Sequence, residues 1–349
     1  MKRSTTKRHR SMSRLCWGGV AALTFTTSCA PGLRLAPPLQ MQAWVVYYDA
    51  DRGLEEVRIH GALFDRISLF AYELRPDGFP QPAPNMSRMV PQFLAFAEAS
   101  GFEPWVTVVN DVRFGRDSSI LKDAGLVHDI LNDEARRNDH ARALAERAQS
   151  DGFAGLHLDY ERVADSDSSE FRAFVGALNN ELKGRGLELE IVVEPSYGPV
   201  PNPNTASVSV MGYDLHGPHS GPGPRATPEF VSGLQPRAAG DTDNAAGLAI
   251  ALSGFSWSPS GDVTPVDWTA SEQMSAEGRT WQRNAEDGVP NTRLDDGTEI
   301  WFEDPESISR KWDAAWRSGF RRLLLWRLGG NDERLFSLLR DLKRGDVRR

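Results

Sequence analysis

Eight short apolar runs, separated by stretches of helical periodicity, constrain the fold of this 349-residue chain more than any other feature. Several runs are apolar almost throughout, which is typical of parallel strands covered on both faces. The predicted strands are residues 43–49, 66–73, 104–110, 155–161, 187–195, 207–214, 247–255 and 322–329. Parallel strands cannot be joined by tight turns, so the stretches between them must cross over as helices.

The connecting stretches have the pattern of amphipathic helices. The clearest are residues 87–101, 133–152, 168–186 and 305–319. In the second, Ala141, Leu144, Ala145 and Ala148 recur at a spacing of three and four. Eight strand–helix units in about 300 residues predict a (β/α)8 TIM barrel, which we place at residues 41–345. A doubly wound open sheet is the alternative, but no dinucleotide-binding fingerprint follows the first strand.

One connection is much longer than the others. Residues 256–304 separate the seventh strand from the last helix that we predict. Within them, the stretch NTRLDDGTEIWFED has Asp-Gly between two strand-like runs, which is a strong hairpin signal. We therefore expect a small β excursion on top of the barrel. A second loop, residues 216–230, is dense in Gly and Pro.

The N-terminal segment has the pattern of an export signal. Six basic residues and no acidic one occur before a short apolar run, LCWGGVAALTFTT. That run is too short to cross a bilayer as a helix. We predict a signal peptide at residues 1–28 and, from its Pro-rich composition, a linker at residues 29–40.

Cys29 follows Thr26-Thr27-Ser28, and this stretch resembles the lipobox of bacterial lipoproteins, with Thr26 where leucine is usual. The resemblance implies acylation of Cys29 and a cell-envelope location, in the periplasm or at the outer membrane, with membrane contact through the lipid only. The alternative is a plain cleaved signal. The one other cysteine, Cys16, lies inside the signal, so the mature chain has no internal disulfide or cysteine metal site.

The charge balance argues against a nucleic-acid partner. The chain has 40 Lys and Arg against 48 Asp and Glu. Six of the basic residues belong to the predicted signal, so the remainder carries a formal net charge of −14. Such a surface repels a polyphosphate, whereas a neutral or cationic substrate is easier to accept.

The stretch GFAGLHLDYE, residues 152–161, carries the strongest functional signal. Successive side chains of a strand point to opposite faces, so His157, Asp159 and Glu161 share one face. The two acids fall at the C-terminal end of the fourth strand, where barrels hold their catalytic groups. Residues two apart along a strand have Cα atoms about 6.6 Å apart, so the two carboxylates disfavour each other's ionisation, and we expect at least one pKa to rise, which suits that group to act as a general acid. Alternatively, the acids cap a loop or pair with arginine.

The same stretch resembles the fourth-strand motif D-G-x-D-x-D-x-E of the family 18 glycoside hydrolases, in which the glutamate is the acid. Residues 154–161 read A-G-L-H-L-D-Y-E, so Ala154 and His157 replace two aspartates, while Asp159 and Glu161 are kept. Replacement of the middle acid makes the chain most similar to the branch that includes spore-cortex lytic enzymes.

Two further segments extend this resemblance over most of residues 41–340. Residues 210–223, VMGYDLHGPHSGPG, are similar to the family's sixth-strand M-x-Y-D motif and the loop after it. Residues 301–332 are similar to its closing helix and eighth strand, with Trp326 as the tryptophan that floors the sugar subsite. Three motifs in the right order on the right strands make the resemblance specific.

The resemblance implies a retaining, substrate-assisted mechanism, which departs from the usual two-carboxylate scheme. Glu161 would protonate the leaving oxygen and then deprotonate water. Asp159 would hold the N–H of the substrate's 2-acetamido group, and Tyr213 would donate a hydrogen bond to the acetamido carbonyl. Asp214 would orient a sugar hydroxyl or the surroundings of Tyr213, and Trp326 would stack under the sugar.

Each of these assignments has a structural alternative. Tyr213 and Trp326 could be core aromatics, and Asp214 could cap a loop. His157 is either a buried histidine or a proton partner of Asp159 that helps to bind substrate.

The barrel argument places further side chains at the mouth. Glu73 and Asn110, at the ends of the second and third strands, face it and are expected to contact substrate. Trp44, Tyr47 and Tyr48 could be core or sugar platform.

We expect no cofactor and no metal. No HExxH spacing and no nucleophile elbow is present, and a metal at His216 and His219 in the Gly/Pro loop is disfavoured. The expected function is hydrolysis of β-1,4 bonds after N-acetylglucosamine units, with peptidoglycan as the first candidate substrate and chitin-like glycans as the second. The alternatives are a non-catalytic, lectin-like glycan-binding lipoprotein and a polysaccharide deacetylase, which would require a His/Asp metal set.

Overall fold

The computed structural model describes residues 39–115, 118–196, 198–199, 205–234 and 246–345. The predicted signal at residues 1–28, Cys29 and nearly all of the predicted linker lie outside the described residues. The first strand, β1, begins at Gln40, one residue before the boundary that we drew for the barrel. None of the helices in these ranges is long and apolar enough to cross a membrane.

Eight parallel strands close into a barrel. They are β1 (Gln40–Val46), β2 (Arg66–Leu74), β4 (Glu103–Arg113), β6 (Gly155–Asp159), β7 (Glu188–Val193), β8 (Ser207–Met211), β9 (Gly247–Ala251) and β15 (Arg322–Trp326). Each pairs with its neighbour in chain order, β15 pairs with β1, and β2 pairs with β4 to complete the ring. The predicted (β/α)8 barrel is confirmed, and the open sheet is wrong.

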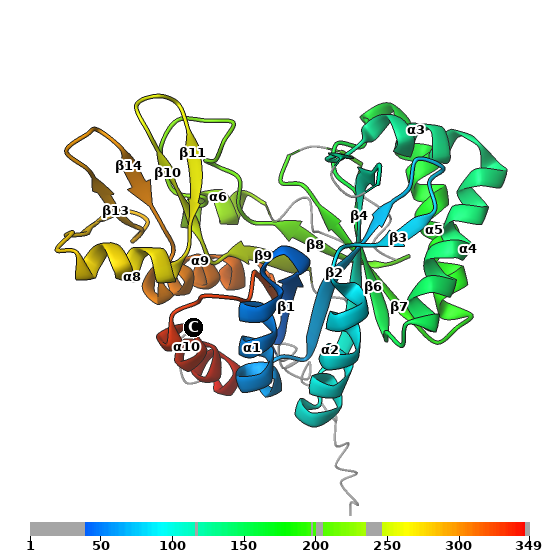
Figure 1. Ribbon diagram of the computed structural model, residues 1–349, viewed down its shortest axis with the longest axis horizontal. Helices are drawn as coiled ribbons and strands as arrows, with labels where there is room; N and C mark the ends of the chain where they lie inside the picture. The colour runs from blue at the N-terminus through cyan, green and yellow to red at the C-terminus, as the bar shows by residue number, and fades with distance from the viewer. Residues whose placement is uncertain (1–38, 116–117, 197, 200–204, 235–245, 346–349) are drawn as a thin grey trace, which may run out of the picture. The chain divides into compact units, whose positions relative to one another are not determined.

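Helices follow the barrel strands and cover their outer faces (Figure 1). They are α1 (Ala50–His60), α2 (Met86–Ser100), α3 (Ala124–Asn132), α4 (Glu134–Ser150), α5 (Ser168–Lys183), α6 (Pro228–Gly233), α9 (Pro305–Arg317) and α10 (Glu333–Arg344). The four small apolar residues predicted to line one face of α4 are fully buried. Because α10 follows β15, the helix predicted at residues 305–319, observed as α9, is not the last one.

The barrel interior has two zones of different chemistry. An apolar cluster fills the part that includes the ends of β8, β9 and β15. Its members are Trp44, Val192, Met211, Tyr213, Ala249, Ala251 and Leu324, with Phe70 and Trp326 packed against them. The other zone is polar and surrounds the fully buried carboxylate of Glu190 on β7.

Glu190 is stabilised as an anion although it has no contact with water. The Ser209 hydroxyl donates to it, and Gln42 Nε2 donates at 3.2 Å. Arg322 Nη1 lies 3.7 Å and His157 Nε2 3.8 Å from its Oε2. Burial alone would raise the pKa of Glu190, but Arg322, His157 and the Ser209 hydrogen bond outweigh it and hold the pKa at about 2.

The predicted excursion is a second sheet with its own small core. It contains β11 (Val263–Val266), β10 (Gly254–Trp257), β14 (Glu299–Trp301), β13 (Pro290–Arg293) and β12 (Gln282–Arg283), with helix α8 (Trp268–Ala276) between β11 and β12. In Figure 1 its longer strands lie together with α8, next to α9. The Asp-Gly hairpin is confirmed as the antiparallel pair β13–β14, with Gly297 at φ +88°. The strand predicted at 247–255 is wrong at its end, because β9 stops at Ala251 and β10 starts at Gly254.

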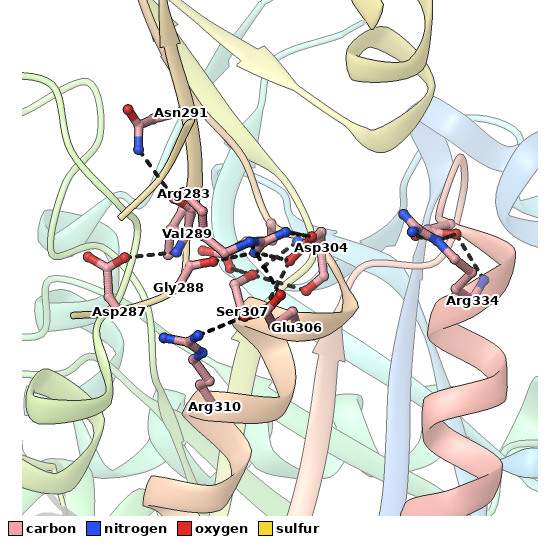
Figure 2. A network of polar contacts seen from close by, with 12 residues as sticks. Arg283, Asp287, Gly288, Val289, Asn291, Asp304, Glu306, Ser307, Arg310 and Arg334 are labelled. Carbon is pink, nitrogen blue, oxygen red and sulfur yellow. Dashed lines mark hydrogen bonds and ion pairs between the residues drawn. The ribbon is translucent and has the colours of Figure 1, made fainter. Parts of the chain in front are cut away.

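An arginine ties this excursion to the start of α9 (Figure 2). Arg283 Nη2 donates to Asp304 Oδ2 at 2.7 Å, and its Nη1 donates to the Gly288 carbonyl at 2.5 Å. Asp304 also caps α9, because its Oδ1 accepts from the backbone N–H of Ser307 at 3.0 Å. The side chain that starts the helix therefore also anchors the excursion, which holds the second sheet beside the barrel.

Candidate active site

Asp159 and Glu161 occupy different depths at the end of β6. Asp159 is the last residue of the strand and is 6% exposed. Its Oδ1 has no hydrogen-bond partner among the described residues. Glu161 lies two residues further along, and its side chain is 12% exposed. The glutamate can therefore reach a molecule at the mouth, whereas the aspartate lies below it with an unused acceptor.

Asn110, three residues before the end of β4, positions Glu161. Its Nδ2 donates to the Glu161 carbonyl at 2.9 Å, and its Oδ1 accepts from the Glu161 N–H at 3.0 Å. Asn110 itself is fully buried. We predicted that Asn110 contacts substrate, and the structure corrects this, because both polar atoms of its amide are bonded to the backbone of Glu161.

A lysine that the sequence reasoning missed forms an ion pair with Glu161. Lys122 Nζ donates to Glu161 Oε2 from the loop after β5 (Ser119–Ile120). The backbone N–H of Lys122 donates to Asp111 Oδ1 at 2.8 Å, which holds the loop against the end of β4. A single lysine in a loop has no spacing that marks it, so no sequence signal could have identified it.

Burial and mutual repulsion set the protonation of the two acids. Burial raises the pKa of Asp159 well above its usual value, and the charge of Glu161 adds to the effect. Burial also raises the pKa of Glu161, with further contributions from Glu194 and Asp214, against the opposing charge of Lys122. The pair therefore tends to hold one proton, as expected for neighbouring buried carboxyls.

Tyr213 and Asp214 follow β8 at the same mouth. Tyr213 is 7% exposed, and burial raises the pKa of its hydroxyl well above the usual value, so the hydroxyl stays protonated and can donate a hydrogen bond. Asp214 adopts a left-handed backbone with φ +75° and has a side chain that is 41% exposed. Arg225, also missed from sequence, donates to Asp214 Oδ1 at 3.2 Å and lies 4.8 Å from the Tyr213 ring centroid.

Trp326 ends β15 and lines a cavity of about 390 Å³. The cavity is also lined by Tyr48, Arg225, Phe255, Asp267 and Arg327, among others. Phe255 belongs to β10 in the excursion, so the second sheet forms one wall of this cavity. An aromatic ring, polar groups and an open face are suited to a sugar unit.

The structure also places Glu73, a predicted contact, and the three aromatic residues that could be core or sugar platform. Glu73 is 3% exposed and forms an ion pair with Arg113, so its carboxylate is not free for substrate. Trp44 is buried, and its Nε1 donates to Thr107 Oγ1 at 3.0 Å, which makes it a core residue. Tyr47 is partly buried and packs against the main hydrophobic core, whereas Tyr48 is 60% exposed and lines the cavity beside Trp326.

His157 is corrected from a substrate contact to a core residue. It is 1% exposed, between the rings of Trp44 and Trp105, with Glu190 rather than Asp159 as its charged neighbour. Burial lowers the pKa of His157 to about 4, although Glu190 opposes the effect. The histidine is thus neutral near pH 7 and lies one step below Asp159 on the same strand face.

No group of three or more His, Cys, Asp or Glu side chains that could hold a metal ion occurs within the described ranges. The two histidines of the Gly/Pro loop bond to the loop itself. His219 Nε2 donates to the Asp214 carbonyl at 3.1 Å, and His216 Nδ1 lies 3.1 Å from the Gly221 carbonyl.

Comparison with known proteins yields distant relatives. No protein-family model matches the chain. The Bacillus subtilis (strain 168) protein named "Putative sporulation-specific glycosylase YdhD" is 24% identical over 310 residues, which are 80% of this chain and 69% of the relative.

Solved structures share the fold. The spore cortex-lytic enzyme SleL of Bacillus cereus aligns with a TM-score of 0.73 and 19% identity, over 87% of this chain and 74% of that one. A class V chitinase from Pseudomonas fluorescens Pf-5 aligns with a TM-score of 0.75 and 22% identity, over 86% of this chain and 98% of that one. The expected resemblance to chitinase-like and spore-cortex lytic enzymes is confirmed, and so is the barrel fold.

Proposed function

We propose that the protein is a retaining glycoside hydrolase that cleaves β-1,4 bonds after N-acetylglucosamine units by substrate-assisted catalysis. One observation carries the proposal: Glu161 reaches the mouth two residues beyond the buried Asp159, whose Oδ1 has no hydrogen-bond partner among the described residues. The similarity to the glycosylase, cortex-lytic and chitinase proteins described above supports it.

The depths of the two acids suggest their roles. Glu161 is the acid, because only a group at the mouth can reach a glycosidic oxygen. Its proton passes to that oxygen as the bond to the anomeric carbon breaks, while the acetamido oxygen of the same sugar forms the new bond to that carbon. Glu161, now a carboxylate, then takes a proton from the water that opens this intermediate. Retention follows from two displacements at one carbon.

The remaining groups stabilise the acetamido side of the sugar. The free Oδ1 of Asp159 accepts from the acetamido N–H and balances the positive charge that develops there. The protonated Tyr213 hydroxyl donates to the acetamido oxygen and orients it for attack. Trp326 supplies a ring under the sugar, and Asp214 bonds a hydroxyl at the rim of the mouth.

The test is cleavage. Residues 29–349 and the Glu161→Gln variant are incubated with purified peptidoglycan and with N-acetylglucosamine oligomers, and new reducing ends are measured. Reducing ends from the first protein only are the expected result. Tight binding without cleavage by either protein would refute the hydrolase and favour the lectin-like alternative.

We further propose that the protein is an exported cell-envelope lipoprotein that acts on N-acetylglucosamine-containing glycans and not on nucleic acid. The basic and apolar N-terminal pattern, Cys29 and the acidic remainder support this. Palmitate labelling of the wild type and of Cys29→Ala tests the anchor. Label in the wild type alone is expected, and equal label in both would refute it.

A further inference from the structure

Lys122 is directed at the proposed acid by the same strand end that positions that acid. The N–H of Asp123, the next residue, donates to the Asn110 carbonyl at 2.9 Å. The side chain of Asn110 holds the backbone of Glu161. Lys122 also adopts a left-handed backbone with φ +56°, a conformation that is strained for a non-glycine residue. The chain therefore maintains a strained loop that places an ammonium group on Glu161.

The ion pair cannot persist through the proposed reaction. Glu161 must carry a proton before it can donate one, and a neutral carboxyl no longer balances the ammonium of Lys122. The Lys122 side chain is 35% exposed, so an incoming ligand can reach it. Burial lowers the pKa of Lys122, but in the resting ion pair the charges of Glu161, Asp159 and Asp214 outweigh this and raise it, so the paired lysine is a cation. An anion on the substrate would replace the partner that Lys122 loses.

The position of Glu161 limits where that anion lies. Glu161 protonates the leaving oxygen, which is O4 of the next sugar in a β-1,4 glycan. In N-acetylmuramic acid, the neighbouring O3 carries a lactyl ether whose carboxylate is a few bonds from this oxygen. In N-acetylglucosamine, O3 carries only hydrogen. A cation beside the acid thus distinguishes the two glycans.

We propose that Lys122 binds the lactyl carboxylate of an N-acetylmuramic acid unit on the leaving-group side, and that it selects peptide-free peptidoglycan strands over chitin. This proposal rests on the proposed function. In strands that keep their stem peptides the lactyl carboxylate is a neutral amide, so an amide hydrolysis that removes the peptides must supply the substrate. The chain carries an excess of acidic residues, and Lys122 is the cation that contacts the proposed acid directly.

Binding to a protein that cannot cleave tests the proposal separately from catalysis. The ligands are a peptide-free tetrasaccharide of alternating N-acetylglucosamine and N-acetylmuramic acid, and the same compound with its carboxylates converted to methylamides. The proteins are Glu161→Gln, Glu161→Gln with Lys122→Met, and Glu161→Gln with Lys183→Met as a control. Lys183 is an exposed lysine at the end of α5, so its substitution removes the same charge at a different place.

Glu161→Gln should bind the carboxylate form at least about tenfold more tightly than the methylamide, as expected for a charge-assisted hydrogen bond. Lys122→Met should abolish that preference, and Lys183→Met should keep it. Equal affinity for both ligands, or a preference that survives Lys122→Met, would overturn the proposal.

Turnover gives a second measurement. The ratio of kcat/KM for peptide-free strands to kcat/KM for N-acetylglucosamine oligomers should fall about tenfold or more in Lys122→Met and be largely kept in Lys122→Arg. Faster cleavage of strands with intact stem peptides by the wild type would contradict the selection. If the wild type cleaves no glycan, the proposed hydrolysis fails, and the binding result alone decides the role of Lys122.

Discussion

Replacing Asn110 by alanine should impair catalysis by Glu161, the proposed acid, although the Glu161 side chain itself is unchanged. The side chain of Asn110 makes two hydrogen bonds, and both go to the backbone of Glu161. The substitution removes both and leaves a part-buried N–H and a part-buried C=O without partners. The carbonyl of residue 110 still accepts from the N–H of Asp123, so the loop that carries Lys122 keeps one of its anchors.

The expected magnitudes follow from these two bonds. An unsatisfied buried polar group costs about 1–3 kcal/mol, so the free energy of unfolding should fall by about 2–4 kcal/mol. Water entering from the mouth would reduce the loss toward the lower figure. Displacing a catalytic group by about 1 Å costs roughly 100-fold in rate, so kcat should fall by about that factor. KM should change little, because Asn110 is fully buried.

The assay combines chemical denaturation with the kinetics of the variant at a temperature where it remains folded. Gln81→Ala is the matched control, because the Gln81 amide also donates to two backbone carbonyls, those of Leu74 and Arg113. It should lose stability with little effect on kcat. A folded Asn110→Ala with wild-type kcat, or one whose loss appears only in KM, would refute the positioning role.

Three further predictions concern stability. The pKa of about 4 for His157 lies below its unfolded value of 6.5, so its contribution is full above pH 6.5 and is lost as the pH falls toward 4. His157→Gln should therefore remove about 3 kcal/mol of acid sensitivity between those values in urea titrations, and an unchanged pH slope would contradict this. Gly155→Ala would place its methyl group 2.4 Å from the Trp105 ring, so it should lower the free energy of unfolding by about 1–3 kcal/mol, seen as a lower thermal midpoint. An unaltered midpoint would argue against the close packing. Lys311→Met would leave the buried Glu303 without its cationic partner and should lower the free energy of unfolding by about 3–5 kcal/mol, measured by denaturant unfolding. Adding Glu303→Gln should restore much of this loss, and a double variant as unstable as Lys311→Met would contradict the reasoning.

The barrel was predictable because its signals are local. Each strand is an apolar run with its own composition, and the spacing of small residues in α4 identifies its buried face. The end of the seventh strand was not predictable. Residues 247–255 form one continuous apolar run, but Leu252 donates its N–H to the Trp326 carbonyl, and β10 then pairs with β14 in the other sheet. Composition cannot show which sheet a strand joins.

The site was predictable in part for the same reason. Alternation along the predicted strand at residues 155–161 places Asp159 and Glu161 on one face, and barrel topology places the end of that strand at the mouth. Lys122 lies 39 residues from Glu161 in the chain, and Arg225 reaches Asp214 from across a Gly/Pro loop. Such pairs are formed only when the barrel closes, and neither cation belongs to a repeating pattern.

The sequence by itself determined the fold class, the order of the strands and the end of the barrel that carries the acids, because strand period and chain order determine those features locally. Only the tertiary structure decided which side chains remain free. Asn110, Glu73 and His157 all lie on the predicted strands. Asn110, however, is hydrogen-bonded to the backbone of Glu161, Glu73 forms an ion pair with Arg113, and His157 is buried in the barrel interior. The pattern of one strand sets the direction of a side chain, whereas its partners and its exposure are set by neighbouring strands that are remote in the chain.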